Sequence, residues 1–236
     1  EHDFDERLYA IKLPMPIPGE MKKTMSQFLF LRPDELVLFQ CLGRNRWSIL
    51  IGNPGISKSW FQWKFILLCY RQDLYQKLRS NEAEEAVLSR ASSTEGSKES
   101  FFELYNKSFI PNLIVRTKAG LESLLFFVDC PMNVFFIEHT PGMLRHITDE
   151  NSTILWEPDE GSTPVNYKSI LSRIIATVPP DTIRIHEFQK NARKFYMTCP
   201  SELQIRLMGI IFRKYATEED SITDEKIHLR VQKYGP

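Results

Sequence analysis

Hydrophobic positions along the chain fall into short runs separated by polar or glycine-containing turns. Residues 47–51 read Trp-Ser-Ile-Leu-Ile and are followed by Gly52, which predicts a buried strand. Residues 59–71 are apolar nearly all round, as expected for a helix that packs against a sheet. The two segments together predict a strand, a glycine-containing loop and a helix.

Other apolar runs extend this pattern. Strand-like runs that precede polar or proline residues lie at 113–117, 153–156, 173–178 and 194–197. The runs 123–128 and 134–137 flank turn residues and predict a β-hairpin. Helices are predicted from residue 32 to a stop at Gly43, and from Ser201, a capping residue, to residue 212. Strands that alternate with helices favour an α/β sheet flanked by helices, with the hairpin as an insertion.

Composition narrows the classes of protein. The 236 residues are 42% hydrophobic, enough for a substantial core, and 30 basic residues balance 30 acidic ones. This balance argues against a global field that attracts nucleic acid, although a local basic face stays an alternative. No apolar run approaches the roughly 20 residues that cross a bilayer. The four cysteines and five histidines lack metal-ligand spacing, so free thiols from a reducing compartment are expected.

Domain organisation is predicted from the residues that interrupt helices and strands along the chain. Residues 1–30 contain a proline-rich run at 13–19, which favours an extended N-terminal lead-in without strand pairing. Residues 31–214 form the expected main domain, and 215–236 the expected start of a helical lid. The chain opens at Glu1 without a signal-peptide pattern and stops within a pattern, so we interpret it as a fragment of a longer protein.

The loop after the first strand carries the main chemical signal. It reads Gly52, Asn53, Pro54, Gly55, Ile56, Ser57, Lys58, Ser59, followed by Trp60, and fits the phosphate-loop pattern Gly-x-x-x-x-Gly-Lys-Ser except at Ser57. Such a loop curls backbone N–H groups around a phosphate at the positive end of a helix. Lys58 is then expected at the β and γ phosphates, and the Ser59 hydroxyl on the bound Mg²⁺.

A phosphate loop works with an acidic residue at the end of a neighbouring strand. Asp129 ends the cleaner apolar run but lies in the predicted hairpin turn. Glu157, with Asp159 just beyond it, ends the rival strand, and the next strand then offers Thr177 as a polar sensor of the γ phosphate. We prefer the Glu157 strand and keep Asp129 as the alternative.

The chain resembles the P-loop domain of the Crinkler effectors and the related retrotransposon-hot-spot proteins. The resemblance rests on the segment from Gly52 to Ser59 followed by Trp60-Phe61, and on Lys194-Phe195-Tyr196-Met197 leading into Ser201-Glu202-Leu203. It covers most of the chain from about Leu36 onward. It implies an ATPase-like domain in which Lys58 and Ser59 carry phosphate and metal, Glu157 or Asp159 is the acid, and Thr177 lies on the sensor strand.

The expected function is therefore a Mg²⁺-dependent nucleoside triphosphatase that binds ATP, with GTP as the alternative nucleotide. The resemblance further implies a secreted effector that acts inside host cells, often in the nucleus, and that meets nucleic acid through a downstream domain. Ser57 departs from the family pattern at a glycine, so binding is a firmer expectation than hydrolysis. The competing hypothesis is a nucleotide-binding or host-protein interaction module without turnover.

Overall fold

The computed structural model describes residues 7–13, 28–52, 58–78, 110–118, 122–130, 133–138, 143–158, 170–179 and 186–215. The chain forms two compact units, one of residues Glu1–Leu36 with Thr198–Pro236 and one of residues Val37–Met197. The sequence placed its boundaries elsewhere, after residues 30 and 214. Residues 14–19 of the proline-rich run lie outside the described residues, as do residues 216–236.

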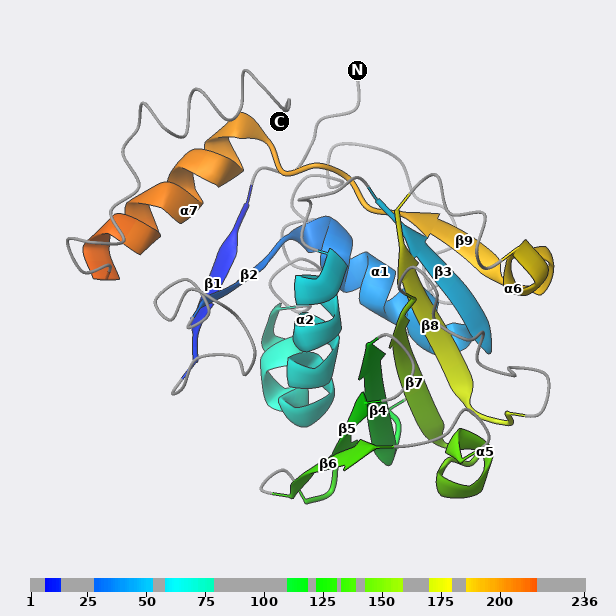
Figure 1. The fold of residues 1–236 in the computed structure, drawn as a ribbon. Helices are drawn as coiled ribbons and strands as arrows, with labels where there is room; N and C mark the ends of the chain where they lie inside the picture. The colour runs from blue at the N-terminus through cyan, green and yellow to red at the C-terminus, as the bar shows by residue number, and fades with distance from the viewer. Residues whose placement is uncertain are drawn as a thin grey trace, which may run out of the picture. The chain divides into compact units, whose positions relative to one another are not determined.

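A seven-stranded sheet forms the centre of the larger unit, with β6 at one edge and β9 at the other (Figure 1). Its order is β6-β5-β4-β7-β8-β3-β9. The strands, in this order, are Val134–Glu138, Glu122–Phe127, Leu113–Lys118, Ser152–Glu157, Arg173–Val178, Trp47–Ile51 and Arg193–Tyr196. All neighbours from β4 to β9 are parallel, whereas β5 runs antiparallel to β4 and β6. The predictions of an α/β sheet and of a hairpin insertion are confirmed.

Helices cover both faces of this sheet. One face carries a core that includes Ile49, Ile154 and Ile174, closed by Leu144 of α5 (Leu144–Ile147) and Phe188 of α6 (His186–Asn191). The opposite face meets α2 (Lys58–Tyr70), whose buried Gln62 is hydrogen-bonded to β8. Because the central strands are covered on both sides, their sequences are continuously apolar rather than alternating.

The helix predicted after the first strand is confirmed almost to the residue, since α2 spans Lys58–Tyr70. Its side chains at 61–66 are all buried, which matches the apolar character on every side. Helix α1 (Pro33–Arg44) packs on it through the rings of Phe39 and Phe65, 4.9 Å apart. Gly43 was predicted to stop α1, but the helix continues one residue further to Arg44.

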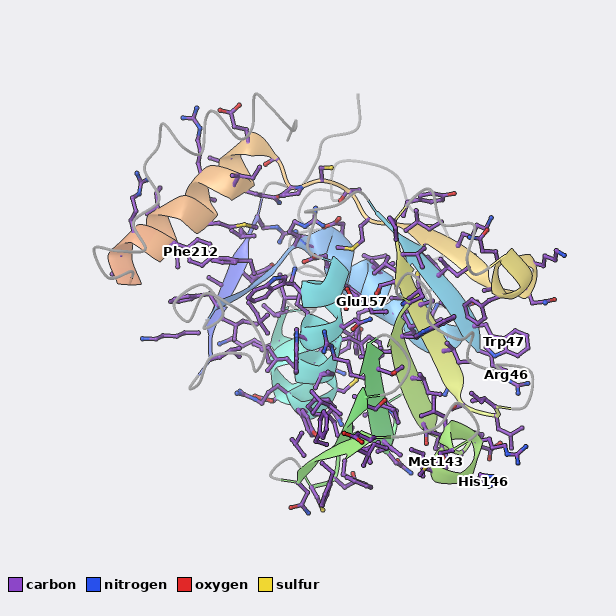
Figure 2. The ribbon with its side chains drawn as sticks, in the orientation of Figure 1. Arg46, Trp47, Met143, His146, Glu157 and Phe212 are labelled. Carbon is purple, nitrogen blue, oxygen red and sulfur yellow. The ribbon has the colours of Figure 1, made fainter. Side chains whose placement is uncertain are left out.

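The smaller unit contains a two-stranded sheet and helix α7 (Glu202–Tyr215). Strand β1 (Tyr9–Lys12) pairs antiparallel with β2 (Phe28–Leu31), so the expectation of an unpaired lead-in is wrong at these four residues. Phe212 of α7, labelled in Figure 2, sets its ring edge-on against Phe30 at 5.2 Å. None of the described helices has the length and apolar character needed to cross a membrane.

Ser201 caps α7 as predicted. Its hydroxyl accepts a hydrogen bond from the backbone N–H of Gln204 at 3.2 Å, and the Gln204 side chain accepts one from the Ser201 N–H at 3.0 Å. This reciprocal pair satisfies N–H groups that the first turn of a helix leaves without a partner. Glu35 acts similarly at α1, because its carboxylate accepts the N–H of Arg32 at 3.0 Å.

Candidate functional site

The carboxyl ends of the five parallel strands lie along one edge of the sheet. Strands β3 and β8 are adjacent there, with Ile51 opposite Val178. The N–H of Gly52, the first residue of the predicted phosphate loop, donates to the carbonyl of Val178 at 3.3 Å. The loop therefore leaves the sheet directly beside the end of β8.

The connections that follow β3 and β8 cross the sheet in opposite directions. The next strand after β3 is β4, which lies toward the β6 edge of the sheet. The next strand after β8 is β9, which lies on the opposite side of β3. Right-handed crossovers place two such connections on opposite faces. Helix α2 follows β3 and covers one face, and α6 follows β8 and packs into the core on the other. In open α/β sheets, ligands bind in the crevice outside such a reversal.

The predicted loop is described only at its two ends. Gly52 ends the strand segment, and Lys58 and Ser59 form the first turn of α2. Residues Asn53, Pro54, Gly55, Ile56 and Ser57 lie outside the described residues. Trp60 follows in α2 and is partly buried. The start of α2 thus directs its free backbone N–H groups, and the positive end of its dipole, away from the helix body toward the loop.

The two candidate acids lie at opposite ends of the sheet. Glu157 is the last residue of β7, beside α2 in Figure 2, and β7 is separated from β3 by β8 alone. At the usual spacing of strands this places the two strands about 10 Å apart. Asp129 follows β5, whose Phe127 pairs with Leu113 at the amino end of β4. The topology brings Glu157 to the edge of the sheet where the predicted phosphate loop begins, and takes Asp129 to the opposite edge. Asp159 lies outside the described residues.

Glu157 belongs to a polar cluster, partly buried at Glu157 and Arg116 and buried at Gln62 and Thr177, that sequence reasoning missed. The Arg116 guanidinium of β4 lies 3.7 Å from a Glu157 carboxylate oxygen, and its Nε donates to the Gln62 side-chain oxygen at 3.1 Å. The Gln62 amide donates to the Thr177 hydroxyl at 2.9 Å. We refer to Glu157, Arg116, Gln62 and Thr177 as the polar relay. It joins β7, β4, α2 and β8 on the face that α2 covers.

The sequence did contain a signal for the missing members. Arg116 interrupts the apolar strand Leu-Ile-Val, and Gln62 interrupts an apolar helix, so each is a polar residue at a position that is otherwise core. Gln62 is 1% exposed and Thr177 3% exposed. Buried polar groups need partners, and here each partner comes from a different element. Pairing of this kind is set by tertiary structure and is not visible along the chain.

Thr177 lies in β8, which is the strand predicted to carry it, and pairs with Leu50 of β3. Its hydroxyl accepts from Gln62 and lies 3.5 Å from the backbone carbonyl of Trp156, to which it donates. Thr177 is therefore held beneath α2 and tied to β7, the strand that carries Glu157. In this structure its hydroxyl forms the β8 end of the polar relay.

Oxygen donors at this edge suit a hard divalent cation. Mg²⁺ at nucleotide sites is held by one or two protein oxygens together with phosphates and water, which matches a hydroxyl at Ser59 and a carboxylate at Glu157. Among the described residues, three or more His, Cys, Asp or Glu side chains nowhere gather into a metal-binding group.

Comparison of the chain with protein-family models, with curated proteins and with solved structures found no match.

Proposed function

We propose that the chain is a P-loop module that binds a nucleoside triphosphate with Mg²⁺ at the carboxyl edge of β3. The observation that carries the proposal is the coincidence of two independent features at one point. The segment from Gly52 to Ser59 matches a phosphate loop in its residues, and it leaves the sheet at the topological reversal between β3 and β8. A chance motif has no reason to fall at that position.

The placement of the acids supports the same proposal. An acidic residue near the Ser59 end of the loop would help to hold Mg²⁺, and Glu157 ends a strand on that edge. Lys58 would supply the ammonium that offsets the phosphate charge, and Ser59 the metal-facing hydroxyl. Mg²⁺, when bound, supplies the Lewis-acid charge that stabilises the phosphoryl group. ATP is the proposed nucleotide, with GTP as the alternative.

Lys58→Ala tests the proposal directly. Loss of the charge-assisted contact should weaken nucleotide binding by roughly 1.5–3 kcal/mol, about 10-fold to 100-fold. Isothermal titration of Mg-ATP into the wild type and the variant measures this change. Lys214→Ala is the control variant, because it removes a lysine from the last turn of another helix, α7. Lys64→Ala is unsuitable because Lys64 is buried in α2. Equal affinities for the wild type and Lys58→Ala would reject the nucleotide proposal.

Binding without turnover is the second candidate function. It is favoured by the ion pair between Glu157 and Arg116, because a carboxylate held by a guanidinium is less available to polarise an attacking water. Phosphate release from Mg-ATP distinguishes the two functions. Steady release that Glu157→Gln abolishes supports an NTPase, whereas binding with no release supports a module that acts by contact.

The effector role is proposed on the resemblance of the Gly52 to Phe61 and Lys194 to Leu203 segments to Crinkler-type domains. Secretion and action inside a host cell are parts of that same proposal. Localisation of the tagged chain in host tissue tests them separately from nucleotide binding.

A further inference from the structure

We infer that Arg116 is a positioning residue that holds the Glu157 carboxylate in a defined place relative to α2. Arg116 thereby couples the acid on β7 to the helix that begins with Lys58. The inference rests on the proposed function, because it assigns a role to Arg116 within the same nucleotide site. It concerns a residue that neither the phosphate-loop pattern nor the acidic strand includes.

The geometry of the guanidinium is the first argument. Arg116 uses two different nitrogens for two different elements: Nε donates a hydrogen bond to Gln62 of α2 at 3.1 Å, and Nη2 lies at the ion-pair distance of 3.7 Å from a carboxylate oxygen of Glu157 in β7. A planar guanidinium with donors in a fixed fork can hold two acceptors at a set angle, whereas a lysine ammonium acts as a point charge. The side chain therefore links Gln62 and Glu157, through a hydrogen bond to the first and an ion pair to the second.

The link is partly shielded from solvent. The Arg116 side chain is 12% exposed and Glu157 23% exposed, and the guanidinium lies 4.6 Å from the centre of the Trp63 ring, which is also in α2. Two consecutive residues of α2, Gln62 and Trp63, thus contact the same guanidinium. A shift of α2 along its axis would move Arg116 and, through it, the Glu157 carboxylate.

At its β8 end, the polar relay makes a second connection between α2 and β7. Gln62 donates to Thr177, and the Thr177 hydroxyl donates to the carbonyl of Trp156, the residue before Glu157. Glu157 is therefore tied to α2 by two routes, through its own side chain and through the backbone of its neighbour. Lys58 and Ser59 lie in the first turn of α2, one turn before Gln62. Phosphate bound at that turn and metal bound at Glu157 would share one connection.

The test measures how strongly Mg²⁺ improves nucleotide binding, as the ratio of the dissociation constants for ATP in EDTA and in Mg²⁺. Arg116→Met should lower this ratio about 10-fold, as expected when a residue that orients a metal ligand is lost. Arg116→Lys should recover part of the ratio, because it restores the charge beside Glu157 but not the fork to Gln62. Arg173→Met, which removes an arginine from the amino end of β8, should leave the ratio unchanged.

A double variant separates positioning from general structural damage. If Arg116 acts through Glu157, Arg116→Met should change the ratio no further in a Glu157→Gln background. A purely structural role would instead weaken ATP binding equally in EDTA and in Mg²⁺, in both backgrounds, and that result would overturn the inference. Thermal unfolding of each variant identifies any that fails to fold, and Arg116→Lys then serves in place of Arg116→Met.

Failure of this inference differs from failure of the proposed function. If Lys58→Ala abolishes ATP binding while Arg116→Met leaves the ratio at its wild-type value, the nucleotide site stands and the role of Arg116 is rejected. If Lys58→Ala has no effect on binding, the proposed function is rejected first.

Discussion

At the scale of single residues, environment decides which side chains are reactive. Cys69 in α2 is completely buried, and burial raises the pKa of its thiol well above the ordinary range. Cys130 and Cys199 are exposed, and Cys41 is partly buried. The sequence predicted free thiols but did not order them by reactivity, because reactivity follows exposure and thiolate content.

Thiol labelling tests this ordering. We expect a maleimide at pH 7.5 to modify Cys130 and Cys199 first, Cys41 more slowly, and Cys69 only after the chain is unfolded. Mass spectrometry of the labelled peptides identifies the order. Rapid labelling of Cys69 in the folded chain would contradict the packing of α2.

Burial of Cys69 should also make the stability of the chain depend on pH. Because the folded state keeps the Cys69 proton that the unfolded state loses, the free energy of unfolding should fall as pH rises above about 9. This part of the loss should vanish in Cys69→Ala.

The residue scale also separates the two candidate acids. Composition and periodicity left Asp129 and Glu157 both open, since each ends an apolar run. The antiparallel direction of β5 then takes Asp129 to the amino end of β4, whereas β7 runs parallel to β3. Strand direction depends on pairing between distant segments, so local pattern alone did not supply it.

At the scale of elements, capping explains where α7 begins. Ser201 and Gln204 exchange side-chain and backbone hydrogen bonds, and the Gln204 amide also donates to the carbonyl of Arg7. The motif was visible in the sequence because a capping box depends only on residues three apart. The contact with Arg7 was not visible, because it joins the two ends of the chain.

Ser201→Ala should destabilise α7 by about 1 kcal/mol, the usual cost of a lost N-cap. Ser201→Asp keeps an acceptor at the cap and should retain most of the stability. Hydrogen exchange of the amides in the first turn of α7 provides the measurement. Equal exchange rates in the wild type and Ser201→Ala would show that the hydroxyl does not hold the helix end.

At the scale of the whole molecule, the order of the strands sets where the predicted loop leaves the sheet. The five parallel strands appear along the chain as β3, β4, β7, β8 and β9, but β3 is inserted between β8 and β9 in the sheet. This insertion produces the reversal beside Gly52, where the predicted phosphate loop begins. The alternation of strands and helices predicted the class of fold, but not this order.

Ligand binding should appear as stabilisation of the folded chain. A ligand present at 100 times its dissociation constant, and bound only by the folded state, adds about 2.7 kcal/mol. For a chain of this size the unfolding midpoint should then rise by roughly 5–10 °C with Mg-ATP. Differential scanning fluorimetry measures the shift, with Mg-AMP and Lys58→Ala as controls. The same shift in Lys58→Ala would place the bound nucleotide away from the predicted loop.

The sequence by itself determined the elements around the site: strand 47–51, the helix after it, the strands ending at Glu157 and Val178, and the cap at Ser201. Each of these depends on neighbours within a few residues, through period, propensity and short-range hydrogen bonds. Only the tertiary structure decided that Glu157 shares an edge with Gly52, that Asp129 does not, and that Arg116 and Gln62 connect the acid to α2. These relations join residues some 40 to 115 positions apart and arise from strand pairing and burial, which no local pattern encodes.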